Sequence, residues 1–243
     1  MIQHETQGDL SVITLDRAQK RNAMLPEMLE GLLAAIEASG DARAVVLVGA
    51  GKTFCAGFDL KACAADPSGE TMRALLSGLS SCVRAMRVCP APVVLGVHGA
   101  AVAGGCALLG GADVVVAARD AKLGYPVVKI GVSPAVSSPF MLASMTPGVV
   151  RSRLVDTELV DGARAFELGM VHALVDTADE VHAHAMELGR SIAQKPGVGC
   201  LTTKRWLNEI CEVTDSTSQQ GLDASLSLTG GEEERARLAA LWG

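Results

Sequence analysis

The chain has 243 residues, of which 49% are hydrophobic and 20% charged, and its formal net charge is −6. This length and composition predict one domain with an appendage, or two small domains, around a substantial core. Scattered basic residues and an aromatic content of 3% argue against a nucleic-acid-binding surface.

Cysteine usage and the N-terminus predict a cytoplasmic protein. The seven cysteines form no C-x-x-C pair, which favours reduced thiols over a disulfide scaffold or a zinc site. The N-terminus lacks the basic and apolar regions of a secretory signal. Residues 91–118 are apolar enough to span a bilayer, but their six glycines, with Pro92, His98 and Asp113, favour a buried strand–turn–helix–strand segment and no membrane association.

Strands and helices alternate along most of the chain, and helical periodicity dominates from residue 137 onward. This order predicts an α/β fold, with a core over residues 1–190 and a helical C-terminal region over residues 191–243 that could pack against a neighbouring subunit. The expected strands are residues 10–15, 44–48, 92–97, 113–117, 122–125 and 171–175. The expected helices are residues 26–39, 70–88, 104–110, 178–195, 198–212 and one that begins near residue 231.

Two glycine loops, each directly after a buried strand, carry most of the chemical information. The first is Phe54–Leu60 and the second is Ala103–Leu108. Backbone N–H groups at such junctions lack intrahelical partners and point outward together. Two of them aimed at one point would stabilise a developing oxyanion. By contrast, Gly49–Thr53 lacks the first glycine of a phosphate-binding loop, and Gly99–Gly105 misses the dinucleotide-binding spacing.

Four motifs occur in one order along nearly the whole chain. They are Asp16-Arg17 with Arg21–Met24, then Thr53–Leu60, then Pro92–Gly99 continuing into Ala103–Leu108, and finally Ala163–Val171. Together they resemble the enoyl-CoA hydratase/isomerase family, which is the crotonase superfamily.

This resemblance implies a crotonase-like spiral of ββα units whose helical C-terminal region mediates trimerisation, giving a homotrimer or a dimer of trimers. It implies an acyl-CoA or acyl-carrier thioester, with CoA or phosphopantetheine as part of the substrate and neither a separate cofactor nor a metal. By motif position, the N–H groups of Phe58 and Gly105 form the oxyanion hole. The positions that match the CoA path are Lys20, Ala23, Ala56, Asp59 and Leu60.

The sequence departs from the family where hydratases carry two glutamates. Those positions match Val127 and Ser152. Valine cannot move a proton, and a serine without a partner is a poor general base. The sequence therefore argues against simple hydration, while the family also hosts isomerisation, decarboxylation, dehalogenation and C–C cleavage on the same oxyanion hole.

Another residue must then transfer protons if the protein is an enzyme. Tyr125 is a candidate acid, with a surface-exposed hydroxyl as the structural alternative. Ser133 is the next candidate, with a turn or helix cap as its alternative. The remaining candidates are Ser137, Ser138, Asp59 and Glu158.

The loop at residues 131–140 resembles that of methylglutaconyl-type hydratases and polyketide-pathway dehydratases. This resemblance favours a branched acyl group or a carrier-protein thioester. Three functions stay open: a lyase or isomerase of acyl thioesters in fatty acid metabolism, a non-catalytic acyl-CoA-binding homologue, and a diketone hydrolase.

Overall fold

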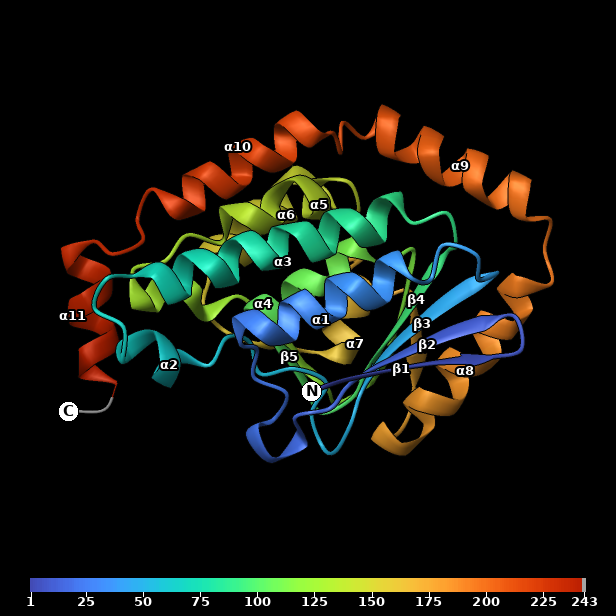
Figure 1. The fold of residues 1–243 in the computed structure, drawn as a ribbon, viewed down its shortest axis with the longest axis horizontal. Helices are drawn as coiled ribbons and strands as arrows, with labels where there is room; N and C mark the ends of the chain where they lie inside the picture. The colour runs from blue at the N-terminus through green and yellow to red at the C-terminus, as the bar shows by residue number, and fades with distance from the viewer. Residues whose placement is uncertain (242–243) are drawn as a thin grey trace.

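A six-stranded sheet forms one layer of the molecule (Figure 1). The computed structural model describes residues 1–241. The strand order is β1-β2-β3-β4-β6-β9, with β1 antiparallel to β2 and every other neighbouring pair parallel. These strands are β1 Ile2–Gln7, β2 Leu10–Leu15, β3 Ala44–Gly49, β4 Val93–Val97, β6 Val114–Ala118 and β9 Ala173–Val175.

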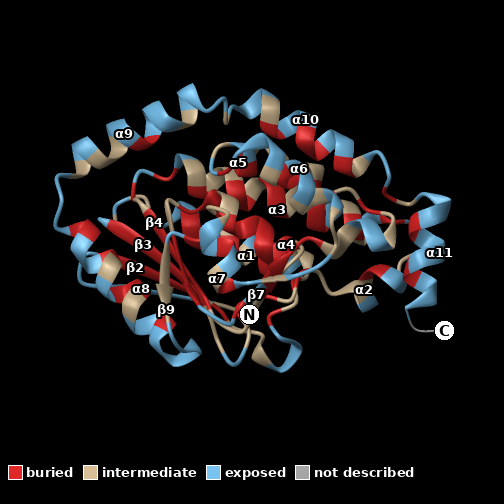
Figure 2. Cartoon of the chain, turned by 180° about the vertical axis from the view of Figure 1, so that it is seen from behind, coloured by how far each residue is buried: buried red, intermediate tan, exposed pale blue. Residues whose placement is uncertain are grey.

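Helices cover both faces of this sheet, so strands β3 and β4 are buried on both sides and consist almost entirely of apolar residues. On one face, Leu47 of β3 packs in the same cluster as α1 (Pro26–Glu37) and α3 (Glu70–Val88). On the other face, Val46 packs with residues of α8 (Ala178–Ala193). Figure 2 shows the buried strands between these helical layers.

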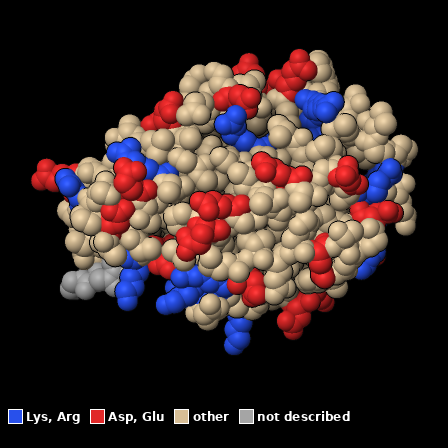
Figure 3. All heavy atoms as spheres, viewed as in Figure 1, with Lys and Arg blue, Asp and Glu red and all other residues tan. Residues whose placement is uncertain are grey.

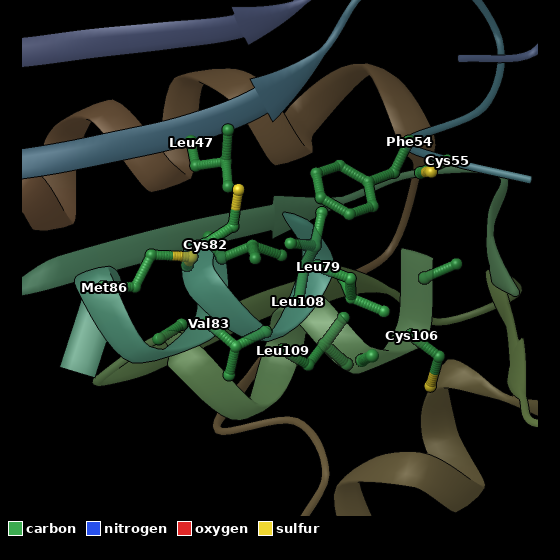
Figure 4. Packing of buried hydrophobic residues seen from close by; sticks show 14 of the residues in the cluster. Leu47, Phe54, Cys55, Leu79, Cys82, Val83, Met86, Cys106, Leu108 and Leu109 are labelled. Atoms are coloured by element: carbon green, nitrogen blue, oxygen red, sulfur yellow. The ribbon is translucent and has the colours of Figure 1, made fainter. Parts of the chain in front are cut away.

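The longest core helix, α3, confirms the predicted helix at residues 70–88 in both its bounds and its apolar face. Figure 4 shows its Leu79 and Cys82 in one cluster with Leu47 of β3 and with Leu108, the last residue of the second glycine loop. The helical spacing of its apolar residues explains this burial, because positions three and four apart lie on the same face. The buried side chains of α3 are Met72, Leu75, Leu76, Leu79, Ser80, Cys82, Val83 and Met86.

A second, three-stranded sheet lies next to the glycine loops. Its order is β5-β7-β8, from Ala100–Val102, Lys122–Gly124 and Val160–Asp161. The segment 91–118 forms β4, β5, a short helix and β6, which confirms the predicted buried strand–turn–helix–strand arrangement. No helix within residues 1–241 has both the length and the hydrophobicity needed to cross a bilayer.

The remaining helices are short, except in the C-terminal region. They are α2 Leu60–Ala64, α4 Gly104–Ala107, α5 Ser138–Leu142, α6 Pro147–Val155, α7 Gly162–Glu167, α9 Gly197–Ile210, α10 Asp215–Leu226 and α11 Glu232–Ala240. The 3-10 helices are Ala18–Lys20, Leu108–Gly111, Pro126–Ile130 and Pro134–Ser137.

The C-terminal helices form an arch over α3 (Figure 1). Helix α10 packs against α3 and the 3-10 helix Pro134–Ser137, while α11 contacts α2 and the 3-10 helix Pro126–Ile130. The predicted boundary after residue 190 falls inside α8, which continues to Ala193. On the face drawn in Figure 3, acidic and basic side chains are interspersed.

Candidate functional site

The first glycine loop is held by a buried asparagine. Asn22 is fully buried at a positive φ of 53°. Its Nδ2 donates to the carbonyls of Ala50, Thr53 and Phe54 at 2.8–3.0 Å, and its Oδ1 accepts from the Arg17 N–H at 2.8 Å. Turn segments leave backbone carbonyls without ladder partners, and a side-chain amide can satisfy several of them. Asn22 therefore fixes the path of the chain into the loop.

The two glycine loops pack directly against each other. The N–H of Cys55 donates to Ala100, and the Cys55 carbonyl accepts from Val102, both at 3.0 Å. Gly105 lies so close to this strand pair that a Cβ would fall 2.5 Å from the Cys55 carbonyl oxygen. Gly57 has a φ of 94°, and a Cβ there would fall 2.9 Å from the Val102 carbonyl oxygen. Both positions therefore require glycine.

Several backbone N–H groups of these loops have no backbone acceptor within residues 1–241, among them those of Gly57, Phe58, Gly104 and Gly105. The last two lie in the first turn of α4, where intrahelical acceptors do not exist. Residue Ala103, just before α4, has a positive φ of 52° and turns the chain sharply into that helix. Phe58 and Gly104 both line a cavity, and Gly105 does not.

This cavity has a volume of about 270 Å³ and apolar walls. Leu76 and Leu79 of α3 line one side, and Val132 and Val136 line another. Among its described lining residues there is no Asp, Glu, His or Cys. The polar side chains in the lining are Tyr125, Lys129, Ser133 and Ser137.

Tyr125 lines the cavity but is only 3% exposed, so the surface alternative considered for its hydroxyl is wrong. The hydroxyl donates to the carbonyl of Cys106 in α4 at 3.1 Å. Burial raises the pKa of Tyr125 well above 10, with further contributions from Cys106 and a smaller opposing one from Ser137. The hydroxyl is therefore held as a neutral donor to the loop that carries Gly104 and Gly105.

Ser133 also lines the cavity, and its hydroxyl has a structural partner. Its Oγ accepts from the Ala135 N–H at 3.2 Å and thereby caps the 3-10 helix Pro134–Ser137. Its carbonyl accepts from the Ser225 hydroxyl of α10 at 2.9 Å. Ser138 donates to the Ala135 carbonyl and is not part of the lining.

Of the two positions matched to hydratase glutamates, the structure places Val127 in the cavity wall. Ser152 is exposed on α6, donates to the Val149 carbonyl at 2.9 Å and lies outside the lining. The expectation that residue 152 faces the substrate is therefore wrong. Sequence reasoning also missed Ala107, which lines the cavity three residues after Gly104. Its place directly after the Gly-Gly-Cys run was the available signal.

Asp59 belongs to an internal ion pair and is not part of the cavity lining. Its carboxylate lies 2.8 Å from Nη2 of Arg17, with both side chains less than one fifth exposed. It also accepts from the Ala62 N–H and caps α2. Burial alone would raise the pKa of Asp59, but the hydrogen bonds from Arg17 and Ala62 and the arginine charge hold it below its usual value.

The other residues matched to the CoA path take different places. Ala56 and Leu60 line the cavity, Lys20 is exposed, and Ala23 is half-buried, with its carbonyl accepting from Nη1 of Arg17. Glu158 is exposed and lies 3.6 Å from Nζ of Lys129.

Sheets flanked by helices, with two packed glycine loops above an apolar cavity, define a protein of the crotonase fold class. The model of the enoyl-CoA hydratase/isomerase family matches residues 5–236. The chain is 31% identical to the 1,2-epoxyphenylacetyl-CoA isomerase of Escherichia coli K12, over 98% of this chain and 89% of that protein.

A second relative is the (7aS)-7a-methyl-1,5-dioxo-2,3,5,6,7,7a-hexahydro-1H-indene-carboxyl-CoA hydrolase of Mycobacterium tuberculosis H37Rv, 33% identical over 85% of this chain and 83% of that protein. The crystal structure of an enoyl-CoA hydratase/isomerase from Xanthobacter autotrophicus Py2 superposes with a TM-score of 0.88, at 30% identity, over 98% of this chain and 91% of the other. The chain belongs to the enoyl-CoA hydratase/isomerase family, within the crotonase superfamily.

Proposed function

We propose that the protein binds an acyl-CoA or acyl-carrier thioester and polarises its carbonyl between two backbone amides. One observation carries this proposal: two residues with unpartnered N–H groups, one from each of the two packed loops, line the same apolar cavity. Phe58 supplies one donor. The second donor was expected at Gly105, but Gly104 is the residue that lines the cavity, so we assign the second donor to Gly104.

This arrangement stabilises the charge that develops on a thioester oxygen when the α-carbon loses a proton or when a bond at that carbon breaks. Donors fixed in advance need no reorganisation during the reaction, and loss of one such donor costs about 3–4 kcal/mol in comparable sites. The surrounding cavity is apolar, which strengthens the electrostatic effect because little water competes.

The CoA portion of the ligand is proposed to lie along Lys20, Ala23, Ala56 and Leu60. The exposed ammonium of Lys20 suits a phosphate group, while Ala56 and Leu60 line the cavity. Asp59 contributes indirectly, because its pair with Arg17 holds the start of α2 in place.

The lining does not support water addition assisted by glutamates, because it contains no carboxylate among the described residues. A lyase or isomerase would need another proton carrier, and Tyr125 and Ser133 are the candidates within the lining. The same observation favours a second function, a homologue that binds acyl-CoA without turnover, because both hydroxyls already have structural partners.

Deuterium exchange at the α-carbon tests the oxyanion hole directly. Butyryl-CoA is incubated with the protein in D₂O, and the loss of α-protons is followed by NMR. In Gly104→Ala, a Cβ would fall 2.7 Å from Met24 Cε and 2.8 Å from Phe58 Cε1, so the Met24 and Phe58 side chains must shift beside the two proposed donors. We expect exchange to fall by about 10²–10³-fold. The control is Ser152→Ala, at an exposed position outside the cavity.

The two candidate functions give different results in this experiment. Exchange that depends on Gly104, followed by turnover of an enoyl, β,γ-enoyl or malonyl thioester, supports an enzyme. Tight binding in calorimetry without exchange or turnover supports the non-catalytic function. If no thioester binds, the proposal fails.

We also propose that the chain assembles as a homotrimer or a dimer of trimers, in the cytoplasm. Helix α9 supports the assembly, because it exposes a row of large apolar side chains and buries only Lys204. Its exposed apolar residues are Val198, Trp206, Leu207 and Ile210. Light scattering coupled to gel filtration gives the mass in solution, and a monomer at micromolar concentration would contradict the assembly. The seven free thiols support a reducing compartment.

A further inference from the structure

We propose that the acyl group is an uncharged hydrocarbon of about eight carbons, linear or branched, and that Met72 sets its length. The estimate follows from the cavity volume, because a methylene occupies about as much space as a liquid water molecule, ~30 Å³. A cavity of about 270 Å³ then holds at most eight or nine such groups, counting the thioester carbonyl. This inference rests on the proposed thioester binding.

The cavity walls favour hydrocarbon over polar acyl groups. Met72, Leu76 and Leu79 are each 2% exposed or less and present a continuous apolar surface along α3. The hydroxyls of Tyr125 and Ser133 are already hydrogen-bonded to the protein. A carboxylate at the far end of the acyl chain would lose its hydration and gain only the neutral O–H groups of Ser133 and Ser137 as donors, because the Tyr125 O–H already donates to Cys106. This loss of hydration is costly.

Lys129 does not change this conclusion. It is the only cationic side chain among the described residues of the lining, but it is more than half exposed and lies 3.6 Å from the carboxylate of Glu158. Its ammonium group is therefore at the solvent-facing side of the cavity and already has a counter-charge. Ser137 carries the remaining hydroxyl of the lining, so the acyl group is expected to carry at most one weakly polar substituent, placed to hydrogen-bond with this hydroxyl.

Met72 separates the acyl cavity from a second cavity of about 200 Å³. This second cavity lies between α2, α3 and α11, and Met72 is the residue that lines both. It has a different chemical character, because Glu234 of α11 borders it and is 2% exposed. One carboxylate oxygen of Glu234 accepts from the Gly230 N–H, and the other has no partner within residues 1–241.

The position of Met72 explains why the acyl cavity ends where it does. A chain that extended past Met72 would bring apolar carbon against a buried carboxylate and strip it further of water. The thioether side chain is flexible and apolar, so it can close this boundary without leaving a void. Met72 is thus inferred to be a specificity-determining residue.

Calorimetry with saturated acyl-CoA ligands of increasing length tests the inference. For wild type, we expect the Kd to fall about fourfold per added methylene (~0.8 kcal/mol) from butyryl-CoA to octanoyl-CoA and then to level off. Suberyl-CoA, which ends in a carboxylate at the same length, should bind at least about tenfold more weakly than octanoyl-CoA.

Met72→Ala vacates the space of the thioether side chain, so the Kd should continue to fall to decanoyl-CoA and rise again at dodecanoyl-CoA, which reaches the Glu234 carboxylate. Met72→Leu nearly conserves the volume and should keep the wild-type profile even if Met72→Ala is too unstable to study. Val88→Ala, at an exposed position on the same helix, is the matched control and should leave the profile unchanged.

The same data separate this inference from the proposed function. If butyryl-CoA binds and exchanges its α-protons but chain length has no effect, or if suberyl-CoA binds as well as octanoyl-CoA, the hydrocarbon inference is overturned while the function stands. A Met72→Ala profile identical to wild type overturns the role of Met72. If no CoA thioester binds at any length, the inference and the proposed function both fail.

Discussion

Lys204 provides a buried polar contact between helix α9 and the core, and its replacement by methionine tests how the C-terminal region is attached. Its side chain is 6% exposed. The ammonium group donates to the carbonyls of Met86 and Ala91 at 2.8 and 3.2 Å and lies 2.8 Å from Oδ2 of Asp113. We expect Lys204→Met to reduce the free energy of unfolding by about 3–5 kcal/mol.

This magnitude follows from two opposing contributions. Hydrogen bonds to a charged group each contribute about 1.5–3 kcal/mol, so three of them exceed ~4 kcal/mol. Burying the ammonium group costs several kcal/mol and offsets part of this gain. Removing the lysine also leaves Asp113 with the Val93 N–H, at 2.7 Å, but without a counter-charge. Methionine preserves most of the side-chain length, so the comparison isolates the loss of charge and hydrogen bonds.

Urea unfolding followed by circular dichroism measures the effect. The double variant Lys204→Met/Asp113→Asn removes both charges and should recover part of the lost stability, because no unpaired charge remains. Lys195→Met, at an exposed lysine just before α9, is the control and should change stability by less than about 0.5 kcal/mol. A cost below about 1 kcal/mol for Lys204→Met, or no recovery in the double variant, would refute the reasoning.

Tyr125→Phe should lower the free energy of unfolding by about 1–3 kcal/mol in urea titrations, because the buried Cys106 carbonyl loses its donor. If α-proton exchange persists in this variant, Tyr125 is excluded as an obligatory proton carrier. Asp59→Asn should cost about 2 kcal/mol at neutral pH, because the arginine partner and α2 lose a charged acceptor. The pKa of Asp59 is lowered in the folded protein, so the stabilisation by its carboxylate is fully present above the ordinary value of 3.8 and is lost as pH falls through the folded pKa. The free energy of unfolding of Asp59→Asn should therefore depend less steeply on pH below 3.8 than that of the wild type. An equally steep acid transition would contradict this. In the native protein, a thiol reagent should react with the exposed Cys211 and more slowly with the half-buried Cys200. In the denatured protein, the reagent should react with all seven cysteines. Fast reaction of a third thiol in the native protein would contradict the burial of the other five.

The helices and strands could be predicted where their own apolar residues recur at the spacing of a helix or form a continuous run typical of a buried strand. The apolar face of α3 and the valine runs of β3 and β4 showed which surfaces are buried. Strand β1 was missed because five of its six residues are exposed and polar, and it forms only by pairing with β2 at the edge of the sheet. Strands β5 and β8 have three and two residues, too few to show a pattern.

The candidate site was predictable in part. The glycine loops are visible in the sequence because glycine is required where two backbones lie too close together to leave space for a Cβ, as at Gly105 and Cys55. The contribution of Met72 was not visible, because a methionine on the buried face of a helix has the same spacing whether it packs in the core or borders a cavity. The matching of Ser152 to a hydratase glutamate was wrong because it relied on the number of residues between motifs, and the intervening segments turn repeatedly.

The sequence by itself determined the family, the two glycine loops, and the lack of a carboxylate at residue 127, because each depends on residue types in a local order. Only the tertiary structure decided that Gly104 borders the cavity, that Tyr125 donates to Cys106, and that Met72 separates an apolar cavity from a buried carboxylate. These properties depend on which surfaces of distant elements meet. Packing between segments far apart in the chain determines these properties, so they cannot be predicted from a local sequence pattern.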